Sequence, residues 1–258
     1  MDSYQNINTQ TQNEENGEEV NDEEEHMYDS NQLITSKEDN FRIVQVSDSH
    51  LGTTMNGEEF CKYMEDINSL KPDILVVTGD FIDDNTCYND FKNGAEGLGK
   101  IEAKYGVYFV FGNHDKGYYR RESFTEYDIR KELSNNNVKI LEDECIDITE
   151  NIILIGRQDK EIKNRKSIQE LTEKLDKNKY QIVLDHQPND YKNEANSKVD
   201  LVLSGHTHGG QLIPLGQLGI LLGANDKIYG IEKRDDTTFI VNAGISDWAI
   251  KFKTGTVS

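Results

Sequence analysis

Histidine and aspartate side chains gather at a few points of the chain. Of the six histidines, His26 lies in a polar N-terminal segment, and the other five follow short apolar runs. In Asp48-Ser49-His50 and in His206-Thr207-His208 the potential ligands are two residues apart, so an extended backbone directs both side chains to one side. Each pair could therefore bind one metal ion.

Three further positions offer donors of the same kinds. Asp80, Asn113 and His186 each follow an apolar run. A mixture of carboxylate, amide and imidazole donors favours Mn, Fe or Zn over Ca. One such histidine is more often structural, but several clusters in one chain favour a metal site. The predicted ligands are Asp48, His50, Asp80, Asn113, His186, His206 and His208.

Strands and helices must bring these positions together. The apolar runs at 41–46, 74–78 and 107–111 each end in a polar cluster, and helical spacing separates them at 57–70 and 89–104. This alternation predicts an α/β fold whose strands carry the chemistry at their carboxyl ends. Further strands are predicted at 152–155, 181–184, 200–203 and 238–241, with a helix near 167–177.

The composition predicts one domain with an acidic tail. The first 40 residues hold 12 acidic residues against the single basic Lys37, which is −11 of the formal −20. Residues 1–38 are predicted to be a disordered tail, either a solvated extension or an autoinhibitory or partner-binding segment, and 39–258 a single domain. The remaining −9 argues against general nucleic-acid binding. The three cysteines lack the spacing of a metal or redox motif, which favours reduced thiols.

The N-terminus shows no positively charged start before an apolar stretch, and no segment approaches the ~18–20 apolar residues that span a bilayer. We therefore expect a cytoplasmic protein. Association with a membrane surface is the alternative.

The ordered series of motifs from Asp48-x-His50 through Gly79-Asp80-x-x-Asp83 and Gly112-Asn113-His114-Asp115 to Gly205-His206-x-His208 resembles the calcineurin-like metallophosphoesterases. The likeness covers about residues 41 to 245. It implies a four-layer α/β sandwich, in which two mixed sheets pack face to face between helices. A dinuclear centre is then expected at the strand ends.

The resemblance also implies how the ligands are shared. Asp48, His50 and His208 would hold one ion, and Asn113, His186 and His206 would hold the other. Asp80 would bridge them. Two such ions lower the pKa of a shared water, so that a metal-bridging hydroxide can attack phosphorus.

His114 is the candidate general acid, because it lies next to the ligand Asn113 and is not itself needed as a ligand. We expect the neighbouring Asp115 to orient its imidazole and keep it charged. A purely structural His114 is the alternative. Asp83 is expected to support the site or cap a loop rather than bind metal.

Several residues bear on the substrate. Protein serine/threonine phosphatases of the family carry Arg after the second Asp of Gly-Asp-x-x-Asp, where this chain has Asp84, so a phosphoprotein substrate is not expected. The string Gly205-His206-Thr207-His208-Gly209-Gly210-Gln211, with Pro214 after it, resembles a bacterial branch that cleaves phosphodiesters or pyrophosphate links. Some members of that branch cleave a UDP-linked diacylglucosamine, for which 212–215 and 218–222 could form an apolar rim rather than ordinary core.

Basic residues could contact such a substrate or simply lie on the surface: Lys116, Arg120, Arg121 and Arg157. The predicted partner is a small phosphodiester or a nucleotide-linked substrate, which makes a phosphodiesterase the favoured enzyme. A lipid A precursor hydrolase, a phosphomonoesterase and a non-catalytic scaffold of the same fold are the alternatives.

Overall fold

The first sheet is built from the N-terminal half of the chain. A computed structural model describes residues 34–35, 41–116, 124–210, 223 and 225–246. The strands of this sheet, in spatial order, are β1 (Ile34–Thr35), β2 (Arg42–Val46), β3 (Ile74–Thr78), β4 (Val107–Val110) and β5 (Val138–Ile140). β1 pairs antiparallel with β2, and the other neighbours are parallel.

The second sheet follows from the C-terminal half. Its spatial order is β10-β11-β9-β8-β7-β6, and the two edge strands β6 and β10 run antiparallel to their neighbours. The bounds are β6 (Glu144–Asp147), β7 (Ile152–Gly156), β8 (Tyr180–Leu184), β9 (Leu201–Ser204), β10 (Gly230–Arg234) and β11 (Thr237–Val241). Both sheets are therefore mixed, as expected.

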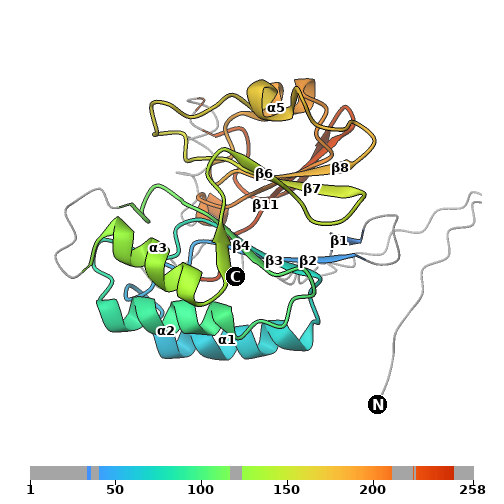
Figure 1. Cartoon of the computed structure of the whole chain (residues 1–258). Helices are drawn as coiled ribbons and strands as arrows, with labels where there is room; N and C mark the ends of the chain where they lie inside the picture. Colours follow the sequence, from blue (N-terminus) through green and yellow to red (C-terminus); the bar gives the residue numbers. More distant parts are fainter. Residues whose placement is uncertain (1–33, 36–40, 117–123, 211–222, 224, 247–258) are drawn as a thin grey trace, which may run out of the picture.

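Helices cover the outer face of each sheet (Figure 1). The helices on the first sheet are α1 (Gly57–Ser69), α2 (Tyr88–Gly99) and α3 (Glu126–Asn135), and those on the second are α4 (Ile168–Thr172) and α5 (Tyr191–Asn196). A short 3₁₀ turn, η1 (His208–Gly210), follows β9. The four layers predicted from the family resemblance are present.

The helix α1 shows why these segments become helical. Asn56 caps its N-terminus and forms a capping box with Glu59. Phe60, Met64 and Ile67 recur at helical spacing and are all buried. The helix ends before Pro72, which cannot continue it.

Alternating residues of the strands supply three separate cores. On β3, Ile74 and Val76 belong to the core between the two sheets, whereas Leu75 and Val77 belong to the core under α1 and α2. All residues of β3 are buried, because both of its faces are covered. A third core lies between the second sheet and its helices. Burial on both faces explains the continuous apolar runs in the sequence.

The structure differs from the sequence prediction in its less apolar elements. α2 ends at Gly99 instead of 104, and α4 ends at Thr172 instead of 177. Elements not predicted are β1, β5, β6, β10, α3, α5 and the 3₁₀ turn η1. β1 lies inside the segment predicted as disordered tail, and the rest of 1–38 lies outside the described residues. Within the described part of the chain, no helix has the length and apolar character needed to cross a bilayer.

Candidate metal centre

The polar clusters lie on loops at one shared edge of the two sheets. The backbone of Asp48 donates to Gly79 O (2.9 Å), which joins the loops after β2 and β3. Gly205 N donates to His186 O (3.0 Å), which joins the loops after β9 and β8. The carboxyl ends of parallel strands therefore bring distant residues together, as the sequence predicts.

Many of the loop residues have positive backbone φ angles, which residues with a side chain rarely adopt. Five of the seven predicted ligands have positive φ: Asp48 (53°), His50 (39°), Asp80 (51°), His206 (73°) and His208 (48°). Gly79, also positive at 85°, has no room for a side chain, because an added Cβ would lie 2.6 Å from His186 Nδ1. Strained backbone of this kind gathers at functional sites, where the surrounding bonds hold it in place.

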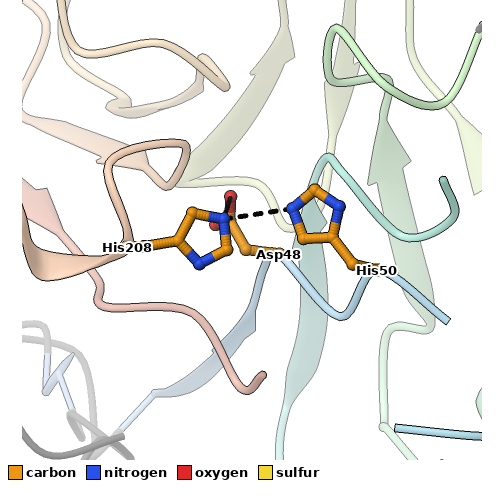
Figure 2. Close-up of side chains that lie close together, drawn as sticks. All are labelled: Asp48, His50 and His208. Atoms are coloured by element: carbon orange, nitrogen blue, oxygen red, sulfur yellow. Dashed lines mark hydrogen bonds and ion pairs between the residues drawn. The ribbon is translucent and has the colours of Figure 1, made fainter. Parts of the chain in front are cut away.

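The first group of potential ligands contains Asp48, His50 and His208, all buried (Figure 2). His50 Nε2 and His208 Nε2 are 3.1 Å apart, and His208 Nε2 lies 3.6 Å from Asp48 Oδ1. The backbone N–H of His206 donates to both oxygens of Asp48 (2.9 and 3.0 Å), and Ser47 Oγ contacts the same carboxylate. These bonds fix the carboxylate with its charge directed at the two imidazoles.

The second group contains Asp80, His186 and His206. His186 Nε2 lies 3.1 Å from Asp80 Oδ2 and 2.9 Å from Asn113 Oδ1. The two histidines predicted for the second ion, His186 and His206, therefore lie next to Asp80, and Asn113 contacts His186. The seven residues expected from the sequence come together in two adjoining groups.

The hydrogen bonds of His186 show that this group suits a cation. Its Nδ1 lies 2.8 Å from Thr78 O, which can only accept, so the ring proton is on Nδ1. In the neutral ring the lone pair of Nε2 then points at oxygens of Asp80 and Asn113, which are also acceptors. A metal ion among the three atoms would satisfy all of them, as would a second proton on His186.

The pKa values within the second group are set by burial and by the charges of its members. Burial lowers the pKa of His186, but the negative charge of Asp80 outweighs it and the pKa rises well above its usual value. Burial and the charge on His186 lower the pKa of His206 to about 3, so His206 is neutral and offers a lone pair. Burial raises the pKa of Asp80, but the positive charge of His186 dominates and the pKa falls.

Asp80 lies between the two groups. Its Oδ2 atom is 3.1 Å from His186 Nε2 and 3.8 Å from His50 Nε2 in the first group. Its Oδ1 atom accepts a bond from the backbone N–H of His114 (2.8 Å). One carboxylate oxygen is therefore near enough to address both groups.

Asp83 contacts the candidate acid His114. Its Oδ1 atom lies 3.1 Å from His114 Nδ1, and its Oδ2 atom lies 3.1 Å from His50 Nδ1. Burial lowers the pKa of His114, but the bond to Asp83 and the charge of Asp80 raise it above the usual value. Burial opposes ionisation of Asp83, yet its bonds to the two histidines lower its pKa. The sequence predicted only a general supporting role for Asp83 and not its contact with His114. Its place in Gly79-Asp80-x-x-Asp83 was the one feature of the sequence that pointed to this residue.

The Asp115 carboxylate accepts hydrogen bonds from four backbone N–H groups. Its Oδ2 atom accepts from the backbone N–H groups of Asp80 (2.9 Å) and Gly112 (2.7 Å), and its Oδ1 atom accepts from those of Phe81 (2.8 Å) and Ile82 (3.1 Å). The carboxylate that reaches His114 Nδ1 is that of Asp83. Asp115 thus joins the loops after β3 and β4, and it acts on His114 through its charge.

Two basic residues considered for substrate contact are engaged elsewhere. Lys116 Nζ bonds to Glu142 Oε1 (2.6 Å). Arg157 has a side chain only 3% exposed and pairs with Asp185, Asp190 and Glu194. Arg120, Arg121, Gln211 and the apolar segments 212–215 and 218–222 lie outside the described residues.

With this geometry in place, comparison with known proteins decides the family. Residues 41–210 match the calcineurin-like phosphoesterases, which is more than half of the chain. The chain belongs to the calcineurin-like phosphoesterase family. The resemblance predicted from the ordered motifs is confirmed at this level.

Curated relatives carry the same family name. A metallophosphoesterase of Bacillus subtilis, YkuE, is 31% identical over 226 residues, which cover 83% of this chain and 74% of that protein. A Caenorhabditis elegans protein named as a metallophosphoesterase, F40B5.2, is 33% identical over 82% of this chain and 45% of its own length. This chain spans about half the length of several such relatives. The solved structure of TT1561 of Thermus thermophilus aligns with a TM-score of 0.49 at 11% identity, over 77% of this chain and 87% of that one.

Proposed function

We propose that this phosphoesterase uses two metal ions to hydrolyse a small-molecule phosphodiester or pyrophosphate bond. The observation that carries the proposal is the place of Asp80, whose Oδ2 atom lies between His186 Nε2 (3.1 Å) and His50 Nε2 (3.8 Å) of the two ligand groups. A shared carboxylate is the usual way to hold two ions close together. The donors are oxygen and imidazole nitrogen, which suit Mn, Fe or Zn.

The predicted ligands divide into two sets, one for each ion. Asp48, His50 and His208 would hold one ion; Asn113, His186 and His206 would hold the other, with Asp80 between them. When bound, such a pair of ions supplies an activated water and neutralises charge on the phosphate. The protein must fix the donors, and it does so through bonds such as His186 Nδ1 to Thr78 O (2.8 Å).

His114 is the proposed general acid. It is half-buried beside the ligand Asn113, and its Nδ1 atom is held by Asp83 at 3.1 Å. Because Asp83 holds Nδ1, Nε2 is the ring nitrogen that would give a proton to the leaving alkoxide. The raised pKa keeps the ring protonated to a higher pH than an isolated histidine. Asp83 is accordingly the positioning residue for His114, and Asp115 supports the loops.

A small phosphodiester is favoured over a phosphoprotein. Asp84 occupies the position after Asp83 where family members that act on phosphoproteins carry Arg, so the bidentate phosphate clamp of a guanidinium is missing there.

Turnover of bis(p-nitrophenyl) phosphate and p-nitrophenyl phosphate with added Mn tests the proposal, with a chelator as control. We expect the diester to be hydrolysed at least as well as the monoester, and chelation to abolish both reactions. A strong preference for the monoester would replace the diesterase with a phosphomonoesterase. If Mn-loaded protein hydrolyses neither ester, the proposal fails and the non-catalytic scaffold is the remaining alternative.

His114→Ala separates the acid from the ligands. We expect a loss of about 10²–10⁴ in kcat, as for general acids elsewhere, for leaving groups of high pKa. The loss should be much smaller for p-nitrophenolate, which leaves without a proton. Metal content measured by atomic absorption should stay near that of the wild type. An equal loss of bound metal would make His114 a ligand or a structural support.

A further inference from the structure

The loop between β7 and α4, residues 157–167, is unusually basic for this chain. It carries Arg157, Lys160, Lys163, Arg165 and Lys166, in a protein of formal charge −20. It begins where β7 ends, and β7 is parallel to β8, whose end leads to the predicted ligand His186. The 157–167 loop therefore starts at the same sheet edge as the metal centre.

Buried carboxylates hold both ends of this loop. Asp143, only 4% exposed, accepts from Gln158 N (3.0 Å), Gln158 Nε2 (2.9 Å) and Lys166 N (2.8 Å). Asp185 accepts from Arg157 Nη1 (2.8 Å) and from Arg165. Such buried, charge-assisted bonds are strong. The loop consequently presents a defined surface instead of a loose chain.

The middle of the loop is fixed to Gln187, the residue that follows the predicted ligand His186. The Asp159 carboxylate, which is buried, accepts from Gln187 Nε2 at 3.1 and 2.9 Å, and Gln187 directly follows His186. The same carboxylate accepts from Glu161 N (3.0 Å), which closes a tight turn around Lys160. Asp159 points inward and Lys160 is exposed at the tip of this turn.

Lys160 differs from the other cations considered for the substrate. Lys116 is paired with Glu142, and the Arg157 guanidinium is buried among carboxylates. Among the described residues, Lys160 has no ion-pair partner within 4 Å. It is a compact cation with three donors, which suits a phosphate oxygen.

From this placement we propose that Lys160 binds a second anionic group of the substrate, next to the phosphate that is cleaved. The substrate class would then be a pyrophosphate-linked compound, whose second phosphate reaches the tip of the 157–167 loop. This inference rests on the proposed function and selects one of its two substrate classes. Lys160 would determine specificity without taking part in the bond-breaking step.

Inhibition by methylenediphosphonate, a pyrophosphate analogue that cannot be hydrolysed, tests the inference. Inorganic phosphate is the comparison, and bis(p-nitrophenyl) phosphate is the reporter substrate at a fixed, saturating concentration of free Mn. For Lys160→Ala we expect the inhibition constant of methylenediphosphonate to rise about fivefold, or about 1 kcal/mol at 1.4 kcal/mol per tenfold, with a smaller change for phosphate. Lys160→Arg should restore most of the affinity.

Lys163→Ala is the matched control, because Lys163 is exposed on the same loop. It should leave both inhibition constants unchanged. An equal weakening of phosphate and diphosphonate by Lys160→Ala, or the same effect from Lys163→Ala, would overturn the inference. If the wild type fails to hydrolyse the reporter, the proposed function fails, and calorimetric titration of Mn-loaded protein with methylenediphosphonate still decides the role of Lys160.

Discussion

Replacing Asp115 by Asn would test whether this residue joins loops or orients the acid. The Asp115 carboxylate accepts from four backbone N–H groups, two on each oxygen. Asn keeps the size but has one acceptor oxygen. In either orientation its NH₂ group would face two buried N–H donors, so two bonds would be lost.

The magnitude follows from those two donors. A buried donor left without a partner costs about 1–3 kcal/mol, so Asp115→Asn should destabilise the fold by about 2–6 kcal/mol. That is a large part of the about 5–15 kcal/mol by which domains are usually stable.

Urea unfolding at pH 7.5, followed by circular dichroism on chelated protein, would measure the change without the contribution of bound metal. Asp66→Asn is the control, since Asp66 is exposed on α1, and it should change stability by less than about 0.5 kcal/mol. Wild-type stability of Asp115→Asn, together with a selective loss of turnover for poor leaving groups, would refute the loop-joining role. It would restore Asp115 as the residue that orients His114.

Further predictions concern the acid, the metals and a buried charge cluster. Asp83→Asn removes a bond that raises the pKa of His114, so the fall of kcat with rising pH should move to lower pH; an unshifted profile would exclude His114 as the titrating acid. Chelation should lower the melting temperature by several degrees and Mn should restore it, because ions bound only by the folded chain stabilise it; an unchanged melting temperature would count against a metal centre. Burial and the charge of Asp185 raise the pKa of Glu194 from 4.5 to about 8, so its contribution to stability is present below pH 4.5 and is lost as pH rises through 8. The unfolding free energy of Glu194→Gln should therefore fall less between pH 5 and 9 than that of the wild type. If it falls equally, groups other than Glu194 cause the pH dependence.

The sequence alone was sufficient to predict the strands that are buried on both faces. β2, β3 and β4 lie within one residue of the predicted apolar runs, because each strand must fill two cores at once. α3 was missed although Thr125 and Asp128 form a capping box, because only Ile129 and Leu133 of this helix are buried. Two apolar residues give too little periodicity to stand out from a loop.

Ligand candidates were easier to predict than their supports. The ordered motifs named the seven ligand candidates, because spacing and strand ends constrain where such side chains lie. The contacts of Asp83 and Asp115 could not be predicted in the same way. The turn after Asp80, a residue with a positive φ of 51°, brings Asp83 to His114. Adjacency in sequence favoured Asp115, whereas Asp83 Oδ1 is the oxygen found 3.1 Å from His114 Nδ1.

Each ligand group takes residues from both sheets, and this has a consequence for how the centre forms during synthesis. Asp48, His50 and Asp80 follow strands of the first sheet, whereas His186, His206 and His208 follow strands of the second. A chain that emerges from the ribosome N-terminus first can build the first sheet and its helices before any of the last three histidines exists. The centre is then incomplete until the second sheet docks. Metal loading of the proposed centre would then follow the docking of the second sheet.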